Sequence, residues 1–432
     1  PVFLGNIFQQ FYNIADSIVA GQFIGVKALA AIGSTGSLMF FVTGWLNGLS
    51  SGFAILVSQW FGAKQYDKMR HYVAMSVYLA GGCAVLMTAG LLIANEPILR
   101  MMNYSAEIMP EVKQYMGIIY AGLIVTAAYN SLAAFLRAIG DSKSPLYFLI
   151  ISAVINVALD VVFIVVFGMG VEGCAYATVI AQAISALLCF IYIVKKFPIL
   201  HLTKSDRKIS FQSFGRLLSL GIPMGLQFSI TAIGTIIVQG AVNVYGETYM
   251  AGFSAAGKLQ NMIMTVFVAF GATVATYVGQ NRGAGRMDRV KSGVRCTQVM
   301  ILVWSVIAMA AVCFGGKYMT WLFIAPSETE VVNVSVLYFR TVFWCYPFLG
   351  SIFLYRNTLQ GMGYGLVPML GGVFELAARS AIVMAAAGRT TFQGVCLADP
   401  AAWIAALIPL VPYYFYTMRK WKTTETKIQK QI

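Results

Sequence analysis

The sequence predicts an all-α integral membrane protein made of two related bundles of six transmembrane helices. Hydrophobic residues make up 59% of the 432 residues and charged residues 11%, whereas soluble domains contain roughly 45–50% and about 25%. The apolar residues lie in long segments that lack the alternation of strands. The second half of the chain also repeats motifs of the first half in the same order.

Twelve segments are long and apolar enough to span the membrane, because about 20 helical residues cross the roughly 30 Å hydrocarbon core. They are predicted at residues 1–24, 30–61, 71–95, 110–138, 145–168, 171–196, 213–245, 250–281, 290–315, 331–361, 365–388 and 398–420. The chain opens inside an apolar segment without an initiator Met, so we expect the first span to be truncated at its start.

The loop charges predict the orientation. Twenty-one Lys and Arg residues fall on the side reached after an even number of spans, and five fall on the other side. Since Lys and Arg accumulate on cytoplasmic loops, both termini are predicted to be cytoplasmic. The net charge of +14 is then mostly a topology signal, and we expect membrane lipids, and no nucleic acid, as partners.

An internal duplication relates the two halves. A shift of 221 residues aligns residues 58–70 with 279–291, and a shift of 223 aligns 135–145 with 358–368. Because each half has an even number of spans, the repeat is parallel, with its pseudo-twofold axis along the membrane normal. Such lobes around a central cleft are typical of alternating-access transporters. The predicted parts are an N-terminal lobe, a cytoplasmic linker, a C-terminal lobe and a cytoplasmic tail, at residues 1–196, 197–212, 213–420 and 421–432.

Over nearly its full length the sequence resembles the multidrug and toxic compound extrusion (MATE) antiporters of bacteria. The resemblance rests on QQFYNIADSIVAGQFIGVKALAAIG (9–33), SQWFGAKQYDKMR (58–70), FLRAIGDSKSP (135–145), INVALDVVFIVVFGMGVEGCAYAT (155–178), LGIPMGLQ (220–227), YVGQNRGAGRMDRV (277–290) and GVFELAARSA (372–381). It implies efflux of small organic, often cationic and amphipathic, compounds in exchange for protons or sodium. It also implies a location in the bacterial inner membrane, and we expect a monomer without cofactors.

Ionisable groups inside the predicted spans are candidates for function, since a charge at the bilayer centre costs at least about 2.5–3.5 kcal/mol. Asp16 shares a polar helix face with Asn13, and Tyr12 lies one turn before it. Asn156 and Asp160 are one turn apart in span 5. If spans 1 and 5 are adjacent, the two carboxyls share a cavity and form a proton or sodium switch. The alternative is that both acids only bond helix neighbours.

The resemblance adds Tyr115 and Thr178 to this site, placed by motif spacing. The site is not duplicated in the second half, where the aligned positions are Ile237 and Val383. No acid follows the GIP motif of span 7, where Gln227, Thr231 and Thr235 line one face. This absence favours protons over sodium, and apart from sodium at Asp16 and Asp160 we expect no metal.

The second half carries other charged groups. Glu375 and Arg379 lie one turn apart in span 11, either as a structural ion pair or as groups that bind substrate or gate the lobes. Lys258 in span 8 either extends outward or pairs with an acid across the cavity. A substrate cavity for varied apolar compounds needs adaptable side chains. The candidates are Met262, Met264, Phe267, Phe40, Phe41 and Phe228.

An enzyme is not expected, because the sequence has two histidines and no GxSxG, HExxH or nucleotide-binding motif. The seven scattered cysteines include no CxxC pair, so neither a zinc site nor a disulfide framework is predicted. Two alternatives remain within transport. One is a flippase for lipid-linked oligosaccharides, which shares this type of fold, and the other is an exporter of an endogenous metabolite.

Overall fold

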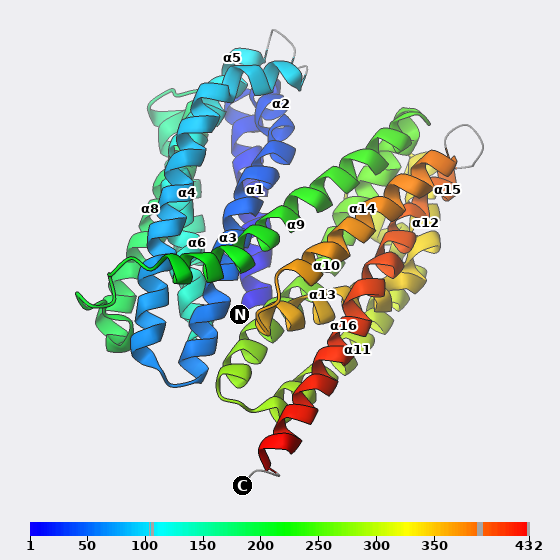
Figure 1. The fold of residues 1–432 in the computed structure, drawn as a ribbon. Helices are drawn as coiled ribbons and strands as arrows, with labels where there is room; N and C mark the ends of the chain where they lie inside the picture. The colour runs from blue at the N-terminus through cyan, green and yellow to red at the C-terminus, as the bar shows by residue number, and fades with distance from the viewer. Residues whose placement is uncertain (103, 105–107, 387–391, 430–432) are drawn as a thin grey trace. The chain divides into compact units, whose positions relative to one another are not determined.

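The computed structural model describes residues 1–102, 104, 108–386 and 392–429, except for the side chains of 10–18, 20, 26, 27, 29, 30, 37, 386 and 422–429. Helices account for nearly all of the described chain, and no strand occurs in these ranges. The predicted all-α class is therefore confirmed (Figure 1).

The chain forms two compact units, Pro1–Gly225 and Leu226–Ile432. The helices of the first unit are α1 Val2–Val19, η1 Ala20–Ile24, α2 Val26–Ser34, α3 Gly36–Gly62, α4 Tyr66–Met101, α5 Met109–Ala121, α6 Leu123–Ala138, α7 Lys143–Val161, η2 Val162–Val166, α8 Val171–Lys196 and η3 Pro198–Leu200. Helix α9, Phe211–Asn243, begins in this unit and continues into the second.

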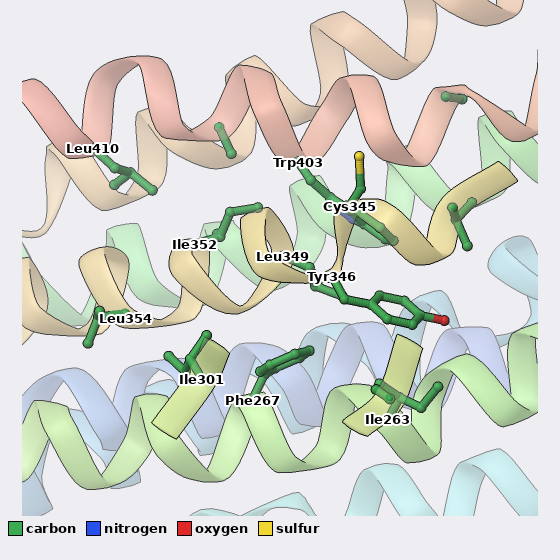
Figure 2. Close-up of a cluster of buried hydrophobic side chains, with 14 of the residues drawn as sticks. Ile263, Phe267, Ile301, Cys345, Tyr346, Leu349, Ile352, Leu354, Trp403 and Leu410 are labelled. Carbon is green, nitrogen blue, oxygen red and sulfur yellow. The ribbon is translucent and has the colours of Figure 1, made fainter. Parts of the chain in front are cut away.

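The helices of the second unit are α10 Glu247–Gly283, α11 Met287–Thr320, α12 Thr329–Val342, η4 Phe343–Cys345, α13 Tyr346–Gly361, α14 Leu366–Ala386, α15 Phe392–Cys396 and α16 Ala398–Gln429. A large hydrophobic cluster forms the core of this unit. Figure 2 shows its centre, where Phe267 of α10 lies beside Ile301 of α11 and Tyr346 of α13. Phe267 is fully buried, so its prediction as a residue lining a substrate cavity is wrong.

In the described part of the chain, ten helices are long and apolar enough to cross a membrane, or eleven if the bent pair α5 and α6 forms one span. Together with α1 and η1 they reproduce the twelve predicted spans. Several helices are longer than predicted. For example, α4 begins at Tyr66 and ends at Met101, because a helix can continue past the hydrocarbon boundary with charged residues that hydropathy assigns to loops.

The backbone supports the internal repeat. Lys64 and Gly285, which are 221 residues apart, both have a positive φ, as do Gly140 and Gly363 at a separation of 223. In both members of each pair the following amide donates to the carbonyl five residues before it, as a Schellman turn requires. The breaks within spans 4 and 10 also correspond, at Gly122 and at η4.

Helices α3 and α9 cross with their backbones in close contact inside the first unit. A Cβ atom at Gly48 would lie 2.7 Å from the backbone of Gly225, and one at Gly52 would lie 2.7 Å from that of Gly221. Both helices thus present a Gly-xxx-Gly pattern, which allows close helix packing in membranes. This contact explains why the boundary between the units lies inside α9, after the predicted linker at 197–212.

The crossing gives a stability prediction. The Gly48→Ala variant is expected to be less stable by about 1–3 kcal/mol, since its methyl group collides with backbone that cannot rotate away. Thermal unfolding of the purified protein in detergent measures this. Gly90→Ala in α4 is the matched control, because a Cβ atom there meets nothing within 4 Å. Equal unfolding temperatures for Gly48→Ala and the native chain would contradict the close crossing.

Candidate functional site

Helices α1 and α7 pack against each other along their length, which meets the condition that spans 1 and 5 are adjacent. Near their starts, a Cβ atom at Gly5 would lie 3.8 Å from Leu146 and 3.9 Å from Leu149. At their ends, η1 contacts η2. The two helices therefore run in parallel, and Asp16 and Asp160 each lie 11 residues beyond Gly5 and Leu149, at the same level.

A polar stripe marks one buried face of α7. Ser152, Asn156 and Asp160 follow one another at one-turn spacing, and all three are buried. The Ser152 hydroxyl donates to the Ala181 carbonyl of α8 at 2.8 Å, which fixes the rotation of this face. Among the side chains that the structure describes, neither amide atom of the fully buried Asn156 has a hydrogen-bond partner.

The two residues added by the family resemblance are also buried in this unit. Thr178 of α8 is 4% exposed and Tyr115 of α5 is 5% exposed. Because Ser152 meets Ala181 on the antiparallel helix, Thr178 lies at the level of Asn156. A Cβ atom at Gly122 would lie 2.5 Å from Val179, so in the parallel pair α5 and α8 Tyr115 lies at the level of Glu172 and Gly173.

Both acid-bearing helices end in a π-helical turn. Segment η1 begins four residues after Asp16, and η2 begins two residues after Asp160. Such turns contain wider hydrogen-bonded loops than an α-helix and occur frequently at functional sites. The sequence patterns used above contain no signal for them. Tyr12, Asn13 and Asp16 themselves lie on α1, and their side chains are outside the described residues.

In the second unit, Glu375 and Arg379 belong to a larger charge network. Glu375 of α14 pairs with Arg379 at 3.6 Å and also accepts a hydrogen bond from Arg356 of α13. Arg379 donates to Asp399 of α16 at 3.3 Å, and Asp399 accepts from Tyr338 of α12 at 2.9 Å. The two guanidinium groups and two carboxylates balance in charge, and they connect α12, α13, α14 and α16.

Sequence reasoning missed two members of this network. Arg356 has no acid within its own predicted span, and Asp399 lies at the edge of the predicted span 398–420, where hydropathy does not distinguish it from a loop acid. In the structure Asp399 lies in the first turn of α16, with a side chain only 18% exposed. The sequence signal is charge balance: Arg356 and Arg379 lie in predicted spans 10 and 11, which contain one acid, Glu375, so a second acid has to come from elsewhere.

The polar side chains on one face of α9 form hydrogen bonds with α13 or with α9 itself. The side-chain carbonyl of Gln227 accepts from the Gln360 amide of α13 at 3.0 Å. The Thr231 hydroxyl donates to the Gln227 backbone carbonyl at 3.0 Å, and that of Thr235 donates to Ala232 at 2.8 Å. The Gln227–Gln360 bond links α9 to α13 within the second unit, and the two threonines bond within α9.

Two further candidates lie on α10. Lys258 is exposed, and its ammonium group lies 5.3 Å from the ring centroid of Phe323, in the segment that follows α11. Met262, one turn further along, is 61% exposed. The exposed aromatic candidates of the first unit are Phe40 and Phe41 of α3, whereas Met264 of α10 packs against the core.

Hydrogen bonds and an ion pair attach the segment between α8 and α9 to α4. The Asp206 carboxylate accepts hydrogen bonds from Thr203 and from Arg70 Nε at 3.0 Å. His71 contacts the Asp206 carbonyl at 3.1 Å and Ser213 at 3.0 Å through its two ring nitrogens. Burial by itself raises the pKa of Asp206, but the bonds from Thr203 and Arg70 outweigh it, and the pKa lies below the ordinary carboxyl value.

This attachment is expected to depend on pH. A carboxyl whose pKa is lowered on folding stabilises the folded form above its unfolded pKa of about 3.9 and loses this effect as the pH falls through the folded value. Hydrogen exchange of residues 197–210, corrected for intrinsic rates, should therefore stay slow at pH 5–7 and accelerate below about pH 4. In Asp206→Asn, exchange should already be fast at pH 7. A native chain whose linker exchanges equally at pH 3 and pH 6 would contradict this.

The fold and the buried polar groups define a class of protein: a duplicated, polytopic membrane transporter with acids in one unit and a neutral charge network in the other. The MatE family model matches residues 1–162 and 223–379, one stretch in each half. The chain belongs to the MatE family, and it is a membrane transporter, not an enzyme.

Individual relatives agree with this membership. The chain is 30% identical to "Probable multidrug resistance protein YpnP" of Bacillus subtilis, over 84% of this chain and 81% of the relative. It is 27% identical to "Probable multidrug resistance protein YoeA" of the same organism, over 98% and 93%. The solved "Crystal structure of MATE in the bent conformation" has a TM-score of 0.92 at 20% identity, covering 99% of this chain and 95% of that one, which shows the shared fold.

Proposed function

We propose that the protein exports small organic compounds from the bacterial cytoplasm in exchange for inward-moving protons, by alternating access of a central cleft. The observation that carries the proposal is the buried polar stripe of Asn156 and Asp160 on α7, at the level of Asp16 on the adjacent α1. The names of the two Bacillus relatives support a multidrug cargo. The charge count supports cytoplasmic termini in the plasma membrane.

The buried Asp160, with Asp16 at the same level of the adjacent helix, suits an ion-driven cycle. A carboxyl in a low-dielectric span is stabilised either by a proton or by a bound cation, so its occupancy follows the ion gradient. Proton binding neutralises the α1–α7 contact, and proton release restores the charge, which changes the packing of two helices that both end in π-turns. Tyr115 and Thr178 supply hydroxyl groups at neighbouring levels.

Protons are favoured over sodium by the second unit. The aligned positions there are Ile237 and Val383, which cannot bind a cation. The oxygens of Gln227, Thr231 and Thr235 take part in bonds to Gln360 or to their own helix. The carboxylates of Glu375 and Asp399 are neutralised by arginines.

Everted vesicles containing the full chain test this proposal. An acidic lumen at equal sodium should drive uptake of a fluorescent organic cation, because protons leave as the cation enters. A sodium gradient alone at equal pH should drive none. Uptake that depends on the sodium gradient and not on pH would show that sodium is the coupling ion. If neither gradient drives uptake of the organic cation and the protein instead moves a lipid-linked oligosaccharide or an endogenous metabolite, the drug-export proposal is wrong.

A further inference from the structure

The second unit contains a groove between three helices that the transport proposal does not use. It lies between the first turns of α11, the second half of α13 and the later turns of α16, and its volume is about 570 Å³, within the roughly 300–1,000 Å³ of small-molecule sites. Tyr355 and Tyr414 contact each other in its wall, with ring centroids 5.1 Å apart and ring planes tilted by 57°. Figure 1 shows that α16 ends and α11 begins at the same end of this unit.

Two cationic side chains lie at one end of the groove. Lys291 and Arg295 lie one turn apart in the second and third turns of α11, and both line the cavity. In the part of the chain that the structure describes, neither has an ion-pair partner. In contrast, Arg286 in the preceding turn is held by Asp288 at 2.7 Å. The groove therefore presents two unneutralised positive charges at the membrane face predicted to be cytoplasmic.

Apolar side chains line the groove beside the two cations and further along α11. Val299 is eight residues beyond Lys291, about 12 Å further along the helix axis. Phe415 and Met418 of α16 complete the apolar lining, and Met418 lies nearer the predicted cytoplasmic end because α16 ends where α11 begins. Gln298 is held in place by a 3.2 Å hydrogen bond from its amide to Ser351. Cationic groups at the interface, followed inward by apolar surface, match an amphiphile with an anionic head and a hydrocarbon chain.

We propose that this groove binds an anionic phospholipid of the cytoplasmic leaflet, with the phosphate at Lys291 and Arg295 and one acyl chain along Phe415 and Val299. Arginine and lysine both bind phosphate oxygens, arginine through two parallel hydrogen bonds. The tyrosine hydroxyls of Tyr355 and Tyr414 provide polar contacts near the glycerol region. The groove thus selects lipids by head-group charge and holds them by the chain.

Native mass spectrometry of the purified full chain, equilibrated with equal amounts of phosphatidylglycerol and phosphatidylcholine, tests the proposal. The native chain should retain phosphatidylglycerol preferentially. The Lys291→Gln/Arg295→Gln variant should lose up to about 25-fold in relative affinity, because each interfacial cation contributes about five-fold. Lys195→Gln/Lys196→Gln is the matched control: these exposed lysines end α8 at the same predicted membrane face, outside the groove.

A second variant tests the apolar part of the groove. Val299→Trp narrows the groove and leaves both cations in place, so it should reduce phosphatidylglycerol retention. Equal retention of the two lipids by the native chain would overturn the proposal. An equal loss in the Lys195/Lys196 control would also overturn it, by pointing to general surface charge. Displacement of the lipid by free glycerol 3-phosphate would show a head-group site that does not use the groove. None of these outcomes depends on the transported compound or on the coupling ion.

Discussion

The Asp160→Asn variant is expected to lose gradient-driven export while folding normally. Asparagine keeps the size of the side chain but cannot gain or lose a proton, so the buried stripe on α7 no longer responds to pH. The expected loss in the response of substrate uptake to an acidic vesicle lumen is roughly 5- to 150-fold, the range that corresponds to coupling free energies of about 1–3 kcal/mol. Everted vesicles with matched protein levels measure it.

Asp67→Asn in α4 is the control for this experiment, because it is the same substitution at a side chain that is 92% exposed. It should retain full gradient-driven uptake. Export by Asp160→Asn at the native rate, with the same dependence on pH, would show that the carboxyl only stabilises the helix packing. Substrate binding measured without a gradient separates a coupling defect from a lost binding site.

The Glu375→Gln variant is expected to be strongly destabilised. Glu375 neutralises Arg356 and lies 3.6 Å from Arg379, and all three side chains are buried. Removal of this charge leaves two guanidinium groups facing the single carboxylate of Asp399. Breaking one partner of a buried ion pair costs about 3–5 kcal/mol. Thermal unfolding in detergent should show a large drop, whereas Glu96→Gln, at an exposed ion pair with Arg100 and Lys113, should change little.

The same network separates the two interpretations of Glu375 and Arg379. The double variant Arg356→Met/Glu375→Leu removes one positive and one negative charge, so much of the lost stability should return. If that variant unfolds near the native temperature and transports normally, the pair is structural. If it is stable and inactive, the charges take part in substrate binding or gating. An unchanged unfolding temperature in Glu375→Gln would contradict the network itself.

Hydropathy, loop charges and the repeat were sufficient to predict the all-α fold and its twelve spans, since each depends on averages over 20 or more residues. Helix ends were less predictable. Helix α3 ends at Gly62, followed by a turn with Lys64 at positive φ, so the turn geometry decides the end and hydropathy does not. Helix α4 then carries charged residues for more than a turn before its apolar part begins.

The candidate sites were predicted to different extents. The Asn156–Asp160 spacing identified a buried polar face from sequence alone, because i and i+4 share a face on any helix. The Arg379–Asp399 contact could not be predicted, because it joins two spans whose relative rotation depends on packing. The prediction that Phe267 lines a cavity is wrong for a related reason. Whether an aromatic side chain faces a cavity or the core depends on which neighbours cover it, and here these are Ile301 and Tyr346.

Helix α9 connects the two compact units. It runs unbroken across the boundary between the two compact units, so the loop that precedes it is not the joint between them. Pro223, two residues before that boundary, has no amide hydrogen, and the carbonyl of Ser219 therefore lacks its usual helical donor. The helical turn at Pro223 is therefore expected to be the point where α9 bends most easily, even though Gly221 and Gly225 on either side of it pack against α3.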